Sequence, residues 1–348
     1  MTDSQFRATS PEDAGAVRAF LQRVFALDDS APVVEPRHLH WKCWEERPDW
    51  PGSRGYVISR QGAIMAHGCV VPLSFQCGER RLKVVYLIDW AAEPGSVGSG
   101  AALLKRIGKM VDAILVVGGS DMTQKILPAL GFKTRGQVTG FARPLHPLAR
   151  LAGQKPTARL GAQFARSLRW TWTAPRQDLS GWEAHRVAPE DLASTAIPWP
   201  KPGSGVTIVE RSPELMSYFL RCPAARMELY SVAKQASVRG YFLLAFPPAQ
   251  ARLVDCWIDS SDGGDWRALV QLAVRQARSN ASVAEIVSVA SDALIHQSLA
   301  GSGFHPRGDN PLRMLASRGA ELPDTPVRFQ MLDSDTAYLH TGTPEFLA

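Results

Sequence analysis

The run Leu87-Ile88-Asp89-Trp90 recurs 166 residues later as Leu253-Val254-Asp255-Cys256. Two further landmarks recur in the same order around it. RATSPED at 7–13 corresponds to RVAPED at 186–191, and GFKTRG at 131–136 corresponds to GFHPRG at 303–308. The offset drifts between landmarks, which indicates insertions and deletions after a duplication. A long repeat outweighs any local motif as evidence of architecture. We therefore predict one mixed α/β unit that occurs twice in tandem.

Each half predicts the same succession of strands and helices. In the first half a hairpin turns at Gln61-Gly62, a long apolar strand covers 82–92, and a glycine turn leads into a helix over 101–110. The second half repeats the hairpin at 230–242, the long strand at 251–258 and the helix at 266–278. Short apolar strands follow at 113–117 and 285–289, and a last strand follows each Gly-Phe pair.

The chain length of 348 residues suits two domains of roughly 150 residues each. We place an N-terminal domain at 1–142 and a C-terminal domain at 181–318. Residues 143–180 form a basic linker, and the tail at 319–348 includes an alternating run at 327–332 that can extend a sheet edge.

The positive charge of the chain gathers around the linker. No Asp or Glu lies between Asp121 and Asp178, while ten Lys and Arg do. Leu160, Phe164 and Leu168 recur at steps of four, which predicts an amphipathic helix. This segment is either a solvated linker helix docked across the domains or a contact surface for an acidic partner, such as an acyl carrier protein or an anionic lipid surface. Nucleic acid is the partner that we expect least.

The five cysteines are scattered and include no Cys-x-x-Cys pair. This usage fits free thiols in a reducing compartment better than a disulfide framework or a zinc site. The sequence starts without a secretory signal, and its longest apolar runs are too short to span a membrane. We therefore expect a cytoplasmic protein without a metal site.

The strongest local feature is the glycine turn after the long strand of the first half. Gly95, Gly98 and Gly100 lead into a helix, and the free N–H groups at a helix N-terminus favour anions. A dinucleotide-binding fold would carry such a turn after its first strand, whereas this turn follows the fourth. A P-loop requires Gly-Lys-Ser/Thr, which is missing here.

The order of elements resembles that of the GNAT acyltransferase superfamily, in a form with two units in tandem. The resemblance covers about 5–142 and 181–316 and includes the hairpins ending in Gly68 and Gly240. In that family the turn after strand four binds the pyrophosphate of acetyl-CoA or a longer acyl-CoA through Gln/Arg-x-x-Gly-x-Gly/Ala. The matching run here starts with Gly95 in place of Gln or Arg. The resemblance implies cofactor contacts at Ala91, Ala92, Glu93, Val97, Gly98, Ser99, Gly100 and Ala101.

The corresponding turn of the second half carries Asp262 and Asp265 beside Gly263-Gly264. Carboxylates at that position repel a diphosphate. We therefore expect the first half to bind the acyl-CoA and the second half either to complete the acceptor site or to support the first half.

The resemblance also implies a mechanism. A main-chain N–H at about 91–93 polarises the thioester carbonyl, a carboxylate or a water chain takes a proton from the amine, and a tyrosine protonates the leaving thiolate. That tyrosine lies five residues before the phenylalanine of the Gly-Phe pair. Leu127 and Leu299 stand at these positions here.

Asp89 and Glu93 are the candidate bases. They lie four residues apart, so on a regular strand they share a face with Leu87 and Ala91, where burial raises a carboxyl pKa. Asp255 repeats Asp89, which fits either a paired acceptor site or a structural role for both. His67 in the facing hairpin is a third catalytic candidate.

Three functions remain open on these residues. The first is a transferase that moves an acyl group, in the first instance acetyl, from acyl-CoA to an amine of a small molecule or amino sugar. The second is a Fem-type aminoacyltransferase that uses aminoacyl-tRNA, which the basic linker favours. The third is a non-catalytic binding or scaffold protein, which the two leucines favour.

Overall fold

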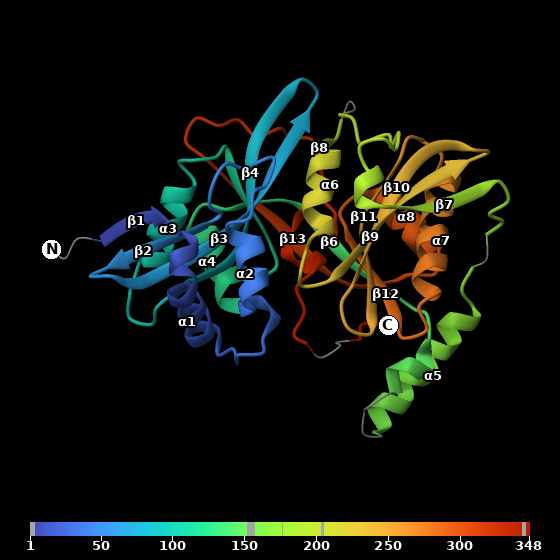
Figure 1. Ribbon diagram of the computed structural model, residues 1–348, viewed down its shortest axis with the longest axis horizontal. Coiled ribbons are helices and arrows are strands. Elements are labelled where there is room, and N and C mark those ends of the chain that lie inside the picture. The colour runs from blue at the N-terminus through green and yellow to red at the C-terminus, as the bar shows by residue number, and fades with distance from the viewer. Residues whose placement is uncertain (1–3, 152–156, 176, 203–204, 343–345) are drawn as a thin grey trace.

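The computed structural model describes residues 4–151, 157–175, 177–202, 205–342 and 346–348. Figure 1 shows two α/β halves side by side, with helix α5 (Ala158–Trp172) projecting from the second half at the lower right. A single 14-stranded sheet runs through both halves. None of the described helices is long and apolar enough to cross a membrane.

The first half supplies six strands and four helices. They are β1 (Ser4–Ala8), α1 (Ala14–Phe25), α2 (Pro36–Cys43), β2 (Gly55–Arg60), β3 (Ala63–Cys77), β4 (Arg80–Ala92), α3 (Ser99–Ile107), β5 (Ala113–Val117), α4 (Asp121–Ala129) and β6 (Lys133–Pro144).

The second half and the tail supply the remaining elements. After α5 they are β7 (Trp182–Val187), β8 (Thr207–Val209), α6 (Pro213–Leu220), β9 (Arg226–Lys234), β10 (Ser237–Phe246), β11 (Gln250–Ile258), α7 (Gly263–Arg278), β12 (Glu285–Ala290), α8 (Ala293–Gly301), β13 (His305–Ala316) and β14 (Val327–Arg328), with two short 3-10 turns, η5 (Met331–Asp333) and η6 (Asp335–Ala337).

Local chemistry explains why these elements begin and end where they do. Asp13 accepts a hydrogen bond from the Ser10 amide at 2.9 Å, which caps the 3-10 turn Pro11–Asp13 that leads into α1. Gln61 and Gly62 both have positive φ, as a two-residue hairpin turn requires. Gly131, with φ of 91°, terminates the turn after α4. The predicted hairpins, long strands and helices of both halves are confirmed.

The two halves exchange their last strands. The strand order is β1-β2-β3-β4-β5-β13-β6-β12-β11-β10-β9-β7. The last strand of the second half, β13, therefore pairs with β5 of the first, and β6 of the first half pairs with β12 of the second. Each spatial unit is thus completed by a strand from the other half of the sequence.

Strands four and five separate in both units. In the first unit, β4 and β5 pair in parallel only from Val84 to Tyr86. In the second, β11 and β12 pair only from Gln250 to Leu253. Beyond these short ladders the strands diverge, so the edges of residues 87–92 and 254–258 have no strand neighbour on that side among the described residues.

A β-bulge interrupts β4 at Asp89. The ladder with β3 pairs Cys69 with Ile88 and His67 with Ala91, so that Asp89 and Trp90 together face one residue, and φ of Asp89 is +49°. The expected common face of Leu87, Asp89 and Ala91 is therefore wrong. Leu87 packs in the core under α3, whereas Ala91 packs in the core under α1 and α2. The bulge turns the Asp89 carboxylate toward α2.

Candidate functional site

The glycine turn forms the N-terminus of α3 with several free donors. Gly95 and Gly98 have φ of 88° and 84°, which glycine adopts without strain. The Ser99 amide donates to the Ser96 carbonyl at 3.1 Å. Among the described residues the amides of Gly98, Gly100 and Ala101 have no hydrogen-bond partner, and no side chain caps α3. Free N–H groups and the helix dipole together give this turn a positive potential that favours an anion.

Trp90 of β4 contacts the glycine turn at the start of α3. Its indole nitrogen donates to the Gly100 carbonyl at 3.2 Å. A Cβ at Gly100 would lie 3.4 Å from that nitrogen, which is ordinary van der Waals contact, so the start of α3 packs directly on Trp90. Val97, at the tip of the turn, is 99% exposed. The turn is thus fixed at its base and open at its tip.

The edge of β4 offers a further donor. The Glu93 amide donates to the Met65 carbonyl at 2.8 Å. Bonded and non-bonded pairs alternate along antiparallel strands, so the next pair, Ala66 with Ala92, is non-bonded. The Ala92 N–H therefore points to the opposite edge, on the side where β4 and β5 separate.

The three expected catalytic residues lie in different environments. The Glu93 carboxylate is paired with Arg23 of α1, with both oxygens at 3.0 Å, and its side chain is 26% exposed. His67 is fully buried, and its Nδ1 lies 3.2 Å from the Asp89 carbonyl. Burial lowers the pKa of His67, which keeps the ring neutral.

Asp89 forms a buried ion pair with Lys42 of α2. Burial works to raise the pKa of Asp89, but the Lys42 ammonium outweighs it and leaves the pKa below its usual value. A carboxylate held in this way is a weak proton acceptor near neutral pH. Asp89 lies in the bulge of β4, and its ion pair with Lys42 links this strand to α2.

Two residues near Asp89 escaped the sequence prediction. His38 of α2 is 1% exposed, and neither ring nitrogen has a hydrogen-bond partner in the described structure. Asp335 of η6 comes from the tail, and burial together with the negative charge of Asp89 raises the pKa of Asp335 to about 7. Neither belongs to a motif, and only the fold brings their segments to β4.

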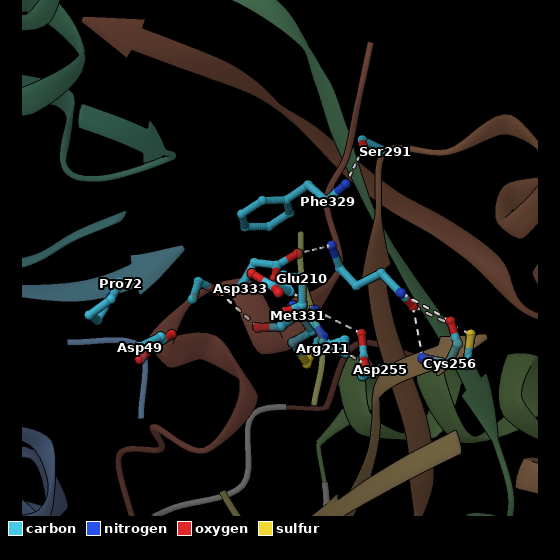
Figure 2. Close-up of polar contacts among 12 residues, drawn as sticks. Asp49, Pro72, Glu210, Arg211, Asp255, Cys256, Ser291, Phe329, Met331 and Asp333 are labelled. Atoms are coloured by element: carbon cyan, nitrogen blue, oxygen red, sulfur yellow. Dashed lines mark hydrogen bonds and ion pairs between the residues drawn. The ribbon is translucent and has the colours of Figure 1, made fainter. Parts of the chain in front are cut away.

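The second unit repeats the ionic arrangement with an arginine. Arg211 contacts both oxygens of Asp255 at 2.9 Å and also Asp333 of η5 at 2.7 Å, and the Tyr241 hydroxyl donates to Asp255 at 2.6 Å. Figure 2 shows Arg211 between the two carboxylates. All of these groups are buried, so the Arg211 ion pair and the Tyr241 hydrogen bond hold Asp255 within the core.

The tail occupies the place where β11 and β12 separate. The Gln330 side-chain amide accepts from the Cys256 backbone N–H and donates to the Cys256 carbonyl, both at 3.0 Å, while the Gln330 backbone bridges to Ala290. Arg328 pairs with Asp292 at 2.8 Å. A cavity of about 10 Å³ remains, which is room for about one water.

The turn of the second unit is capped by its own side chains. Asp262 accepts from the Gly264 amide at 2.8 Å, and Asp265 pairs with Lys234 at 2.9 Å. The two turns therefore differ: the first exposes free amides, and the second presents carboxylates. Leu127 and Leu299, at the positions expected for a tyrosine, are both fully buried in the core. The described residues include no cluster of three or more His, Cys, Asp or Glu that could hold a metal ion.

Known proteins match this chain in structure and not in sequence. No family model and no curated protein matches. A GCN5-related N-acetyltransferase from Anabaena variabilis matches over 90% of this chain and 73% of its own, with a TM-score of 0.58 and 11% identity. A tandem GNAT protein from the clavulanic acid biosynthesis pathway matches over 90% and 99%, with a TM-score of 0.55 and 12% identity.

N-Myristoyltransferase of Saccharomyces cerevisiae, solved with myristoyl-CoA bound, is also similar. It matches over 90% of this chain and 83% of its own, with a TM-score of 0.58 and 11% identity. At these identities the likeness concerns the fold, which is two GNAT-like units in tandem.

Proposed function

We propose that this chain, which has the tandem fold of the GNAT superfamily, is an acyltransferase that moves an acyl group from acyl-CoA to an amine. The observation that carries the proposal is the contrast between the two turns. The amides of Gly98, Gly100 and Ala101 are free at the start of α3, whereas the second turn is capped by Asp262. Similar folds described as N-acetyltransferases support acyl transfer as the reaction class.

The proposed acyl-CoA lies along the first unit. Its diphosphate contacts the turn from Val97 to Ala101, and its pantetheine arm follows the free edge of β4 past Glu93 and Ala91. The Ala92 N–H then donates to the thioester oxygen and stabilises the negative charge that develops there. Since the tail occupies the second separation of strands, we propose one acyl-CoA per chain.

The transfer needs no covalent enzyme intermediate. The amine nitrogen attacks the thioester carbonyl carbon, the carbon–sulfur bond breaks, and the thiolate takes up a proton that the nitrogen releases. We propose that Asp89 and His67 position the β4 edge, because both are buried and Asp89 is paired with Lys42. Glu93 is the partly exposed carboxylate beside the turn and remains a candidate for proton transfer. Acetyl is the proposed acyl group, and a small-molecule amine or amino sugar is the proposed acceptor.

Thermal shift with CoA and acetyl-CoA tests the cofactor site. Gly98→Asp places a carboxylate among the free amides and is expected to abolish the stabilisation that millimolar ligand gives the wild type. Gly62→Asp is the matched control, because Gly62 has nearly the same φ, 81°, in an open hairpin turn. This control is expected to keep the ligand-induced shift. A wild type that millimolar CoA does not stabilise would refute the proposal.

A non-catalytic binding protein is the second candidate. The burial of Leu127 and the ion pairs of Glu93 and Asp89 favour it, because they leave fewer groups free for acid–base work. Turnover of acetyl-CoA with a panel of amines decides between the two. A Fem-type transferase would instead require salt-sensitive binding of tRNA, for which the basic helix α5, with Trp172 83% exposed, is the available surface.

A further inference from the structure

Asp89 has a backbone conformation that residues other than glycine rarely adopt. Its φ of 49° lies in the left-handed region, at the bulge where Asp89 and Trp90 together face one residue of β3. Left-handed backbone costs free energy wherever a side chain is present, although asparagine and aspartate tolerate it better than most residues. A strained residue persists only where its surroundings hold it, and such residues gather at functional sites. Groups that hold Asp89 therefore affect everything that the bulge positions.

Two side chains hold Asp89, one at its carboxylate and one at its backbone. Lys42 of α2 forms an ion pair with the carboxylate, and the two side chains are 3% and 7% exposed. Nδ1 of His67 lies 3.2 Å from the Asp89 carbonyl, an oxygen that can only accept a hydrogen bond. The Lys42 ammonium also donates to the Val33 carbonyl at 3.4 Å, which fixes it to the turn before α2. The bulge is therefore held from both α2 and β3.

The hydrogen bonds of β3 show which amide of β4 faces it before the bulge. The Val70 amide donates to the Arg54 carbonyl at 3.0 Å, so Val70 bonds toward β2. Neighbouring residues of a strand bond to opposite sides, so Cys69 bonds toward β4, where its partner is Ile88. The Ile88 amide therefore faces β3.

Beyond Ile88 the bulge changes which amide reaches the open edge of β4. On a strand without a bulge every second residue faces β3, so Ala92 would face β3 like Ile88, and Ala91 would face the open edge. In the structure the Glu93 amide donates to the Met65 carbonyl at 2.8 Å. Ala91 and Glu93 therefore face β3, and Ala92 faces the open edge. The bulge has transferred the free amide from Ala91 to Ala92.

The bulge also sets the direction of Trp90. Side chains alternate between the two faces of a strand, and Leu87 packs under α3, whereas Ile88 packs under α1 and α2. On a regular strand Trp90 would share the face of Ile88. Its indole instead lies on the side of α3 and donates to the Gly100 carbonyl at 3.2 Å. The free amide and the ring at the base of the glycine turn thus depend on the same bulge.

We infer that Lys42 is a positioning residue for acyl transfer. It lies on α2, on the opposite face of β4 from α3, and its ion pair keeps Asp89 left-handed and the bulge in place. The bulge in turn directs the Ala92 N–H to the thioester oxygen and Trp90 to the start of α3. The inference rests on the proposed acyltransferase function, in which the Ala92 N–H stabilises the charge on that oxygen. Lys42 itself touches no reacting atom.

Two double variants separate the bulge from the charges that hold it. Lys42→Met with Asp89→Leu removes the ion pair and introduces a side chain that resists left-handed backbone. Lys42→Met with Asp89→Gly removes the same ion pair, but glycine adopts that backbone freely. With acetyl-CoA and an amine that the wild type acetylates, we expect kcat of the leucine variant to fall about 100-fold or more, the usual effect of losing an oxyanion donor. The KM for acetyl-CoA is expected to change less.

The glycine variant is expected to regain roughly tenfold or more of the lost kcat, because glycine forms the bulge without the ion pair. A role for the charges themselves in the reaction would leave both variants equally slow. Lys42→Met with Asp89→Ala is a second strained variant, in which no bulky side chain has to be packed at the bulge.

Amide hydrogen exchange measured by NMR tests the bulge without any substrate. In the wild type the Glu93 amide is bonded to Met65 and the Ala92 amide is free. We expect the Glu93 amide of the leucine variant to exchange about tenfold or more faster, while the Ile88 amide keeps its wild-type rate. A general loss of stability would accelerate both amides, so this comparison isolates the bulge.

Gln235→Leu is the matched control, because it places leucine at a φ of 50° in an exposed hairpin turn of the second unit. It is expected to keep the wild-type kcat. Equal kcat values for the leucine and glycine variants, or an unchanged exchange rate of Glu93, would overturn the inference while the proposed function stands. A wild type that neither binds nor consumes acetyl-CoA overturns both.

Discussion

In both units the aspartate of the fourth strand forms an ion pair with a basic residue, and that residue comes from a different segment in each unit. In the first unit the partner is Lys42, and in the second it is Arg211. Buried ion pairs contribute little net stability relative to apolar residues, but removal of one partner leaves an uncompensated charge. The pair at Asp89 therefore acts chiefly to fix the bulge of β4 beside α2.

Lys42→Ala is expected to destabilise the protein by about 3–5 kcal/mol, because it leaves the Asp89 carboxylate buried without its cation. Chemical denaturation at pH 7 measures this change. The double variant Lys42→Met with Asp89→Leu removes both charges and is expected to lose much less. Additive losses in the double variant would contradict a direct pairing of the two groups.

The same pair gives a pH dependence of defined sign. Because the pKa of folded Asp89 is below its usual value, the stabilisation from its ionised form is present above about pH 4. It is lost as the pH falls through the lower pKa of the folded state. The difference in stability between the wild type and Lys42→Ala is therefore expected to be largest near neutral pH and to shrink as the pH falls below about 4, where Asp89 takes up a proton.

Sequence reasoning found Asp89 because it belongs to a repeated run, and it found Gly98 because glycines after a strand have a local signature. It could not find Lys42 or Asp335, which come from α2 and the tail and reach β4 only through tertiary packing. It also placed Leu87 and Ala91 on one face, since strand alternation carries no information about a bulge.

At the scale of elements, the repeat predicted strands and helices well because hydrophobic periodicity and turn residues act locally. The tail was harder to predict. The alternation at 327–332 suggested an edge strand, but only Val327–Arg328 forms one, with β8, and the residues that follow run between β11 and β12. The path of the tail depends on the Gln330 side-chain amide. This amide bonds to the backbone N–H and carbonyl of Cys256, as a neighbouring strand would.

Gln330→Ala is expected to destabilise the protein by about 1–3 kcal/mol, because the amide and carbonyl of Cys256 lose their buried partner. Urea denaturation measures the loss. Gln137→Ala, at an exposed position of β6, makes the same truncation and is expected to change the stability by less than about 0.5 kcal/mol. Equal effects of the two substitutions would show that the tail contact contributes nothing.

At the scale of the whole molecule, the halves defined by sequence are not the units defined by structure. The duplication predicted two similar units, but the exchange of β6 and β13 is invisible in the sequence, because either pairing buries the same apolar residues. The central antiparallel ladder between β13 and β6 joins the units from His305 to Met314. Separation of the halves would therefore expose both β5 and β12.

Residues 1–142 and 181–348, expressed separately, are expected to remain unfolded or to aggregate, because each lacks the strand that covers its fifth strand. Circular dichroism and gel filtration test this. As a control, a protease site inserted between Trp172 and Trp182 of the full chain is cut after folding. The cut fragments are expected to stay together and to melt in one transition. Fragments that part under native conditions would contradict the exchange.

The exchange of strands also determines when each unit can finish folding during synthesis on the ribosome. Strand β5 leaves the exit tunnel about 190 residues before β13, its permanent neighbour. At 5–20 residues per second, the nascent chain carries that bare apolar edge for about 10–40 s. The first unit, although encoded first, is therefore finished last, and in the cell its maturation depends on whatever shields β5 during that interval.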